Sequence, residues 1–292
     1  MPFAPDLPRY FDRIDYRGPT QPSLAHLNAI ILAHVSTIPF ENLDVLLGKP
    51  IDLAPQAVER KLIAERRGGY CFEQNTLLMH VLVALGYAVT PVSARVRIGR
   101  GPSDVPPRTH VFLRVTLPSE PPDELGGHDW LVDVGVGGLS PTSALRLAAD
   151  VTQPTPHEPR RILRRGQWQG FTTRAPDATL LHQAYVDETW FDVCEFTLEP
   201  MPAIDRLLGN WYTSAHPESH FKNRLMVARA TPSGRKSLLN RRYTEREPGT
   251  EKSRELANPA ELRELLASEF GIELAEGAVP QCAGLDWPTP KS

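Results

Sequence analysis

The chain has 292 residues, of which 41% are hydrophobic and 23% charged, values typical of a globular protein with one large domain or a few smaller ones. The net charge of −3 provides no broad basic field, which argues against binding to nucleic acid or to an anionic membrane. No apolar run reaches the length of a membrane span and the basic start of a secretory signal is missing, so we expect a cytoplasmic protein without a membrane segment.

Residues 1–88 show the hydrophobic spacing of helices. The predicted helices begin after Ser23, at Pro55 and near Cys71, and the last two are expected to end at Gly68 and Gly86. Ser23 is a favourable N-cap because its side-chain oxygen can accept a hydrogen bond from a free N–H group of the first turn. Proline suits the first turn of the second helix, where its missing N–H group has no cost.

From about Val89 the hydrophobic period changes from 3.6 to 2, which is typical of β-strands. The alternation is clearest in residues 110–117 and 130–136. Further strand-like runs are Gln167–Thr173 and Trp190–Leu198. Because short strands follow one another with turn residues between them, residues 89–200 are predicted to form an antiparallel sheet or a small β-barrel.

Residues 201–292 mix both kinds of element. A hairpin is predicted from residues 225–231 and 238–244, with its turn at Pro232-Ser233-Gly234. A helix is predicted to begin at Pro259 and to end at Gly271. Helices, then strands, then a mixed unit together indicate an α+β fold.

Cys71 is the strongest candidate for a reactive side chain. The three cysteines, Cys71, Cys194 and Cys282, are too few and too scattered for a disulfide scaffold or a zinc site. Cys71 stands at the expected start of a helix, where free N–H groups and the positive end of the helix dipole favour a thiolate. On position alone, a buried and unreactive cysteine is the more frequent alternative.

His110 and Asp133 are the candidate partners of this thiol. A nucleophilic cysteine needs a base, and among the nine histidines His110 stands out because it occupies a strand, on the face opposite the apolar stripe. Asp133 lies within an apolar strand-like run, where an unpaired carboxylate is costly. An antiparallel hairpin with its turn at Pro121–Pro122 would place His110 opposite Asp133. Each residue alone is a weak signal, whereas a buried aspartate opposite a histidine is a specific one.

Two further patterns carry less weight. His216 and His220 imitate a pair of metal ligands, but Pro217 disfavours a regular helix between them and no third ligand is near, so no metal site is predicted. The glycine-rich segment 135–138 follows a strand but lacks the spacing of a dinucleotide-binding loop. We interpret it as a tight turn that lets the backbone approach a ligand closely.

Several blocks of this sequence resemble the arylamine N-acetyltransferase family. The most specific is Arg67-Gly68-Gly69-Tyr70-Cys71-Phe72-Glu73-Gln74-Asn75, and the others are Ile38-Pro39-Phe40-Glu41-Asn42-Leu43, Arg108-Thr109-His110, Trp130-Leu131-Val132-Asp133-Val134-Gly135, and Asn210-Trp211-Tyr212 followed by His216-Pro217-Glu218-Ser219-His220-Phe221. The resemblance implies a helical bundle over 1–88 and a central antiparallel β-barrel over 89–200. It further implies an interdomain segment with an α/β lid over 201–292, around a cysteine-protease-like Cys-His-Asp core.

The resemblance also implies roles for particular residues. Cys71, His110 and Asp133 would form the catalytic triad. The residues that it places in the substrate and CoA cleft are Phe40, Thr109, Gly135, Val136 and Gly137. Many family members have phenylalanine where this chain has Val136, so a different acceptor preference is expected. Arg235, Lys236, Arg241 and Arg242 are candidates for the CoA phosphates, although we favour a solvated basic hairpin face.

The activity implied is acetyl transfer, with acetyl-CoA as co-substrate and no permanently bound cofactor. In a ping-pong reaction of xenobiotic metabolism, Cys71 would carry the acetyl group to an arylamine, an arylhydrazine or, by O-acetylation, an N-hydroxyarylamine. The alternatives are an amide synthase that closes a macrolactam, a cysteine hydrolase or transglutaminase-like enzyme, and a non-catalytic binding protein of the same fold. The physiological acceptor and the oligomeric state do not follow from the sequence.

Overall fold

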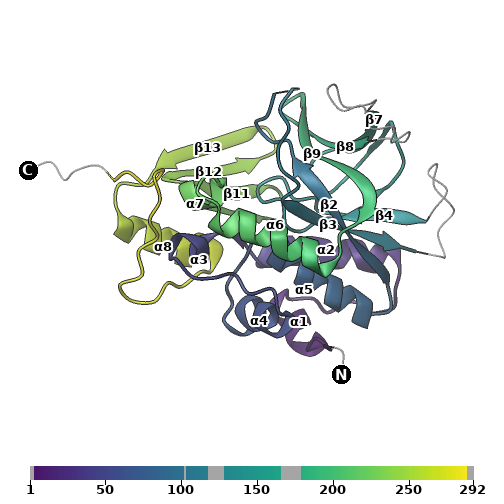
Figure 1. Ribbon diagram of the computed structural model, residues 1–292, viewed down its shortest axis with the longest axis horizontal. Helices are drawn as coiled ribbons and strands as arrows, with labels where there is room; N and C mark the ends of the chain where they lie inside the picture. The colour runs from purple at the N-terminus through teal and green to yellow at the C-terminus, as the bar shows by residue number, and fades with distance from the viewer. Residues whose placement is uncertain (1–2, 102, 118–127, 166–178, 288–292) are drawn as a thin grey trace, which may run out of the picture.

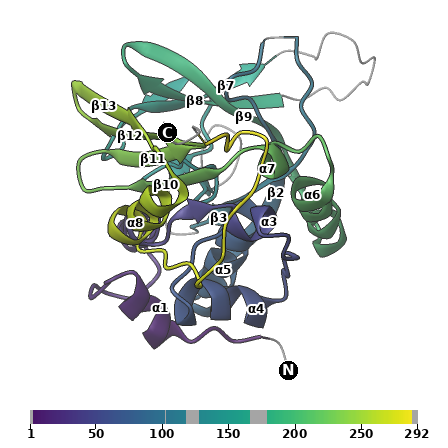
Figure 2. The same cartoon turned by 90° about the vertical axis from the view of Figure 1, so that its left-hand side faces the viewer.

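The computed structural model describes residues 3–101, 103–117, 128–165 and 179–287. The helices of the first part form the base of the molecule, and an eight-stranded antiparallel sheet curls above them into a nearly closed barrel (Figure 1). A five-stranded antiparallel sheet with a helix against it stands beside the barrel, and we call this unit the lid (Figure 2). The predicted α+β class is confirmed. Within the described ranges, every helix is too short or too polar to cross a membrane.

The base of the molecule is built around two long helices. These two are α2 (Leu24–Thr37) and α5 (Cys71–Ala84), and the shorter helices of the first part of the chain are α1 (Leu7–Arg13), α3 (Leu43–Leu46) and α4 (Pro55–Glu59). The last part of the chain contains α6 (Ala203–Ala215), α7 (His220–Asn223) and α8 (Pro259–Phe270). Ser23 caps α2 as predicted, because its hydroxyl accepts a hydrogen bond from the His26 N–H at 3.1 Å. Apolar side chains of α2 and α5 share one buried core with Leu113 and Val115 of the barrel, and this core holds the barrel on the helices.

The predicted end of the second helix at Gly68 is wrong. α4 continues as a π-helical turn over Arg60–Ala64, and Arg66 then takes a left-handed backbone conformation with a φ of 52°. Gly68 has a different role, because a Cβ at this position would stand 2.1 Å from the carbonyl oxygen of Pro39. The glycine therefore lets the segment before Cys71 lie directly against the backbone of Pro39.

The barrel strands confirm the predicted antiparallel pairing. They are β2 (Ala88–Val96), β3 (His110–Thr116), β4 (Asp129–Val132), β5 (Leu145–Arg146), β6 (Val151–Gln153), β7 (Arg160–Arg165), β8 (Thr179–Val186) and β9 (Thr189–Pro200), in the order β5-β4-β3-β2-β9-β8-β7-β6. The predicted run Trp190–Leu198 lies within β9, whereas Gln167–Thr173 lies outside the described residues. Phe112 and Phe196 pack edge to face inside the barrel, with ring centroids 4.8 Å apart.

The predicted register between the strands of His110 and Asp133 is wrong. Leu113 pairs with Val132, and β4 ends at Val132, so Asp133 lies just beyond the strand and not directly opposite His110. The observed register differs from the predicted one by two residues, so the same side chains stay on the same face, and Leu113 and Val132 lie together in the core above the helices. The predicted turn at Pro121–Pro122 lies outside the described residues.

The lid contains a strand from the first part of the chain. Its strands are β1 (Phe40–Glu41), β10 (Met226–Ala230), β11 (Arg235–Leu239), β12 (Arg242–Glu247) and β13 (Thr250–Glu255), paired in that order. The pairing of Phe40 with Ala228 joins the segment before Cys71 to the lid. Apolar side chains of α8 and α3 fill the core of the lid, and α8 begins at Pro259 and ends at Gly271 as predicted.

The predicted hairpin is correct in its first strand, which is β10, and in its turn, but its second strand is wrong. The second strand begins at Arg235, directly after Gly234, and it ends at Leu239. Asn240 then takes a left-handed conformation with a φ of 55°, so the predicted strand 238–244 is divided between β11 and β12 by a second turn. The sequence did not reveal this turn, because asparagine reaches the left-handed region without any glycine to mark it.

Candidate active site

Cys71 is the first residue of α5, as predicted, and its side chain is buried. The Glu73 carboxylate accepts a hydrogen bond from the Tyr70 N–H at 3.1 Å and so caps the helix beside the thiol. The Cys71 Sγ lies 3.7 Å from the carbonyl oxygen of Thr109. The thiol therefore sits at the positive end of a helix, against the segment that leads into β3.

The structure brings His110 and Asp133 together next to this thiol. The His110 Nε2 lies 2.7 Å from the Asp133 Oδ2, and both side chains are buried. Burial alone would lower the pKa of His110, but the carboxylate of Asp133 and a hydrogen bond to Cys71 outweigh it and raise the pKa to about 10. The imidazole is therefore held as a cation between a carboxylate and a thiol.

Asp133 is fixed by two donors besides the histidine. The Asn75 Nδ2 donates to the Asp133 Oδ1 at 3.1 Å, and the Gly135 N–H donates to the same oxygen at 2.9 Å. Burial opposes the charge, yet His110 and these donors together lower the pKa of Asp133. Asn75 was missed as a site residue in the sequence. Its position four residues after Cys71, on the same face of a helix, was the available signal.

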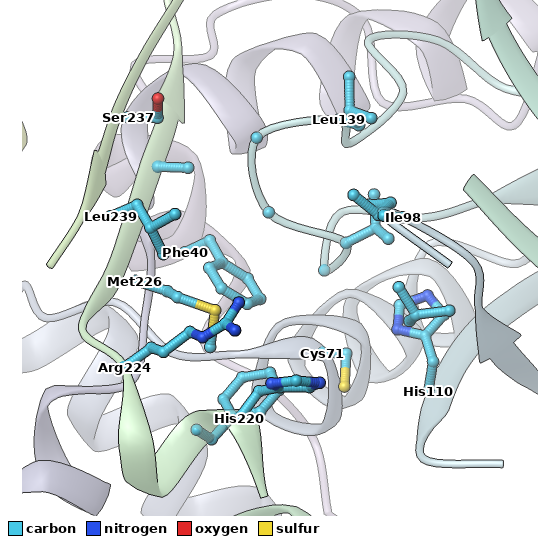
Figure 3. A pocket seen from close by; sticks show the side chains of 18 of the residues that line it. Phe40, Cys71, Ile98, His110, Leu139, His220, Arg224, Met226, Ser237 and Leu239 are labelled. Carbon is cyan, nitrogen blue, oxygen red and sulfur yellow. The ribbon is translucent and has the colours of Figure 1, made fainter. Parts of the chain in front are cut away.

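A cavity of about 840 Å³ opens in front of the thiol, between the barrel and the lid. Its wall contains Cys71 and His110 together with every residue predicted for the cleft, namely Phe40, Thr109, Gly135, Val136 and Gly137. In the view of Figure 3, Cys71 lies between His110 of the barrel and His220 of α7. The cavity wall is mostly apolar around these groups, with side chains such as Ile98, Leu139 and Met226.

The glycine-rich segment 135–138 lies directly against Cys71. A Cβ at Gly135 would stand 2.5 Å from the Cys71 Cα, so only glycine fits there without a shift of the backbone. Gly137 has a φ of +83°, and a Cβ at this position would lie 3.4 Å from the Phe40 ring. The backbone of this segment therefore forms part of the cavity wall closest to Cys71.

The four basic residues that were candidates for the CoA phosphates all have partners within the protein. The Lys236 Nζ donates to the Glu269 carboxylate at 2.5 Å. Arg241 donates to the Leu256 carbonyl oxygen at 3.2 Å, and Arg242 donates to the Ser253 hydroxyl at 3.2 Å. These three residues do not line the cavity, although Arg235 does. Arg235 itself bonds Glu158 at 2.7 Å.

Two other arginines of the cavity wall have no carboxylate partner within the described part of the chain. The Arg100 Nη2 lies 2.5 Å from the His220 Nε2, and this contact joins the barrel to α7 across the cavity. Arg224 extends toward the cavity in Figure 3. Burial, Arg100 and Arg224 together lower the pKa of His220. Neither arginine was singled out in the sequence, because both stand in loops without a local pattern.

The two histidines that imitate metal ligands point to different neighbours. The His216 ring stacks on Tyr212 with centroids 4.4 Å apart, whereas His220 contacts Arg100. A search of the described residues finds no group of histidine, cysteine and acidic side chains that could hold a metal ion. A buried thiol at a helix start, an imidazole–carboxylate pair and an adjoining cavity are together typical of enzymes with a cysteine nucleophile.

Comparison with known proteins narrows this class to one family. Residues 23–279 match the family model described as N-acetyltransferase. The arylamine N-acetyltransferase of Mycobacterium tuberculosis is 45% identical over 276 residues, which cover 94% of this chain and 91% of the relative. A Salmonella typhimurium protein named arylamine N-acetyltransferase / N-hydroxyarylamine O-acetyltransferase is 35% identical, with 90% of this chain and 87% of the relative covered.

Solved structures agree with the sequence comparison. The Mycobacterium marinum arylamine N-acetyltransferase, solved in complex with CoA, is 38% identical and superposes with a TM-score of 0.83 over 91% of this chain and 93% of that one. The chain therefore belongs to the arylamine N-acetyltransferase family and is an acyltransferase.

Proposed function

We propose that this protein transfers the acetyl group of acetyl-CoA to arylamines and arylhydrazines through an acetyl-Cys71 intermediate. The observation that carries the proposal is the 2.7 Å bond between His110 and Asp133, placed next to Cys71 in the wall of a cavity. The CoA complex of the M. marinum relative supports CoA as the carrier of the acetyl group. The name of the S. typhimurium relative supports O-acetylation of N-hydroxyarylamines as a further reaction.

In the first half-reaction, the Cys71 thiolate attacks the acetyl carbonyl carbon of acetyl-CoA. A sulfur–carbon bond forms to Cys71, the bond to the CoA sulfur breaks, and the His110 imidazolium gives its proton to the leaving thiolate. Free N–H groups in the first turn of α5 are available to stabilise the oxyanion of the tetrahedral intermediate. Asp133 holds the imidazole in position and stabilises its charge.

In the second half-reaction, the amine nitrogen attacks the acetyl carbon on Cys71. A nitrogen–carbon bond forms, the sulfur–carbon bond breaks, and neutral His110 takes the proton of the amine, which restores the thiolate–imidazolium pair. The acceptor would lie against the glycine-rich segment and Val136. The smaller valine side chain leaves more room than the phenylalanine of many relatives, which favours bulkier aromatic acceptors.

The charges of the cavity fit a donor that carries phosphates. Arg100 and Arg224 face the cavity without a carboxylate partner among the described residues, so both are available to bind an anion. The three cysteines, Cys71, Cys194 and Cys282, are free thiols, which fits the reducing compartment expected from the sequence. We therefore keep a cytoplasmic location as part of the proposal.

The proposal is tested by intact-mass measurement after incubation with acetyl-CoA. The wild-type protein should gain one acetyl group and lose it when an arylamine or arylhydrazine is added. Cys71→Ala should gain no acetyl group, and Cys194→Ala should behave as the wild type. An acetyl-enzyme that water discharges as fast as the amine would indicate a hydrolase instead. Acylation by a polyketide thioester and none by acetyl-CoA would indicate an amide synthase.

A further inference from the structure

Arg160, at the start of β7, is a fully buried charged side chain close to the active site but not part of it. Its Nη1 lies 3.0 Å from the His182 Nε2, and its Nη2 donates to the Leu139 carbonyl oxygen at 2.8 Å. The Glu158 carboxylate also bonds the same Nη2. Burial lowers the pKa of Arg160 to about 10, which reflects the cost of keeping a guanidinium away from water.

The carbonyl groups that Arg160 binds belong to Leu139 and Ser140, which directly follow the glycine-rich residues 135–138. The longer segment Gly135–Ser140 begins at Gly135, which lies against Cys71, and ends at Ser140, whose carbonyl oxygen is 3.4 Å from the Arg160 Nη2. With glycines at 135, 137 and 138, the segment has few side chains of its own to hold it in one conformation. Arg160 therefore anchors the far end of a flexible segment whose near end covers the thiol.

The anchor continues into the lid through one carboxylate. Glu158 bonds Arg160 in the barrel and Arg235 of β11 at 2.7 Å, and Arg235 lines the cavity from the lid side. The chain of contacts from Leu139 through Arg160 and Glu158 to Arg235 thus connects the glycine-rich segment with the opposite wall. Because Glu158 neutralises the buried guanidinium, the pair is stable only while both partners remain.

The buried neighbours of Arg160 are suited to a structural role and not to a second reactive site. Burial and the Arg160 charge lower the pKa of His182 well below its usual range, so the ring is neutral and its Nε2 accepts from Arg160. Burial raises the pKa of the adjacent Cys194 thiol well above its usual range. Cys194 is 3.8 Å from the His182 Nδ1 but is held as an unreactive thiol.

We propose that Arg160, neutralised by Glu158, is a positioning residue that sets acceptor recognition by fixing the segment Gly135–Ser140 against Cys71. The inference rests on the proposed acetyl transfer, because the segment lines the part of the cavity in which the acceptor would bind. Arg160 forms no hydrogen bond with Cys71, His110 or Asp133 among the described residues, although its charge acts on Asp133. Because Gly135 has its own hydrogen bond to Asp133, acylation of the thiol should change less than recognition of the acceptor.

The test compares Arg160→Met with the double variant Arg160→Met/Glu158→Gln. The single variant leaves Glu158 without one of its two arginines in a buried place, so the melting temperature should fall. The double variant also takes the carboxylate away from the buried Arg235, so the melting temperature should fall further. In both variants, the KM for the arylamine should rise about 10-fold or more, because a loosened wall misplaces the acceptor. The rate at which p-nitrophenyl acetate acylates Cys71 should change by much less than this KM.

Arg13→Met is the matched control. Arg13 is also buried and also binds carbonyl oxygens, those of Leu62 at 3.0 Å and Arg66 at 3.1 Å, but it lies among the helices and does not line the cavity. This variant should melt earlier with an unchanged KM for the acceptor. Arg160→Lys keeps the charge but not the planar fork, so it should retain more stability than Arg160→Met while its KM stays raised.

Two outcomes would overturn the positioning role. In one, both variants melt earlier but keep the wild-type KM for the arylamine, which would make Arg160 a stabilising residue only. In the other, the rate at which p-nitrophenyl acetate acylates Cys71 falls in Arg160→Lys, relative to wild type, as much as the rate at which the amine discharges it. This result would place the defect at the thiol. Either result leaves the acetylation of the wild-type enzyme by acetyl-CoA intact, so the proposed function is judged separately.

Discussion

Cys71, His110 and Asp133 lie far apart in the sequence and meet through three different elements. Cys71 begins α5, His110 begins β3, and Asp133 follows the last residue of β4. The two residues that fix Asp133 besides the histidine, Asn75 and Gly135, come from the helix of the thiol and from the segment that covers it. The site is therefore built at the point where the helical base meets the end of the barrel.

Selective alkylation tests the reactivity of the thiol. At near-neutral pH, iodoacetamide should label Cys71 much faster than Cys194 or Cys282, because Cys71 lies at a helix N-terminus beside a cationic imidazole. Peptide mass mapping after short exposures measures the three rates. Equal labelling of Cys71 and Cys282 would contradict an activated thiolate.

Asp133→Asn tests the orientation of the histidine and carries a pH signature. Loss of the carboxylate should lower the transfer rate by about 10³-fold or more. In the wild type the pKa of His110 is raised to about 10, so the stability from its protonation is complete below the ordinary histidine value and is lost as the pH rises toward 10. The stability difference between wild type and variant should therefore shrink from pH 7 to pH 10. Urea unfolding at several pH values measures the free energy of unfolding of both proteins. A difference that does not change with pH would refute the interaction between the His110 charge and the Asp133 carboxylate.

At the scale of elements, the close contact between the glycine-rich segment and α5 leaves no room for a side chain at Gly135. Gly135→Ala should lower stability by about 1–3 kcal/mol and reduce acetyl transfer, because the new Cβ cannot fit 2.5 Å from the Cys71 Cα. Gly101→Ala is the control, since its nearest contact would be the Asp104 carboxylate at 3.7 Å. Thermal melts and transfer assays measure both variants. A Gly135→Ala enzyme as stable and active as the control would mean that the segment shifts freely.

Predictions of elements succeeded where the signal is local. Ser23 and Gly271 mark helix ends through groups within a few residues, and the structure has both ends where they were expected. The end at Gly68 failed because a distant contact with Pro39, and not the helix, requires that glycine. The strand over 238–244 failed because Asn240 turns the chain without a glycine or proline signal.

At the scale of the whole molecule, the cavity exists only because the lid stands beside the barrel. Arg224 comes from the segment between α7 and β10, and Arg100 from the loop after β2, so two separate segments bring positive charge to the cavity wall. No local pattern marks either residue. The contact of Arg100 with His220 joins these two walls.

Arg224→Met tests whether this charge recognises the phosphates of the donor. The KM for acetyl-CoA should rise about 10-fold, since a hydrogen bond between charged groups is lost. The KM for S-acetylpantetheine, which has no phosphate, should remain unchanged. Lys222→Met removes an exposed cation of α7 outside the cavity and should leave both values as in the wild type. An equal rise for both donors in Arg224→Met would point to a general change of the cavity wall.

The sequence by itself determined the α+β class, the helix starts, the thiol at the start of α5 and, through the ordered blocks, the family. These features are encoded by neighbouring residues, because caps, periodicity and motifs act over a few positions. Only the tertiary structure decided the register of β3 and β4, the place of Asn75, and which arginines are paired. These depend on the burial of side chains and charges brought together from distant segments, for which a single sequence contains no local sign.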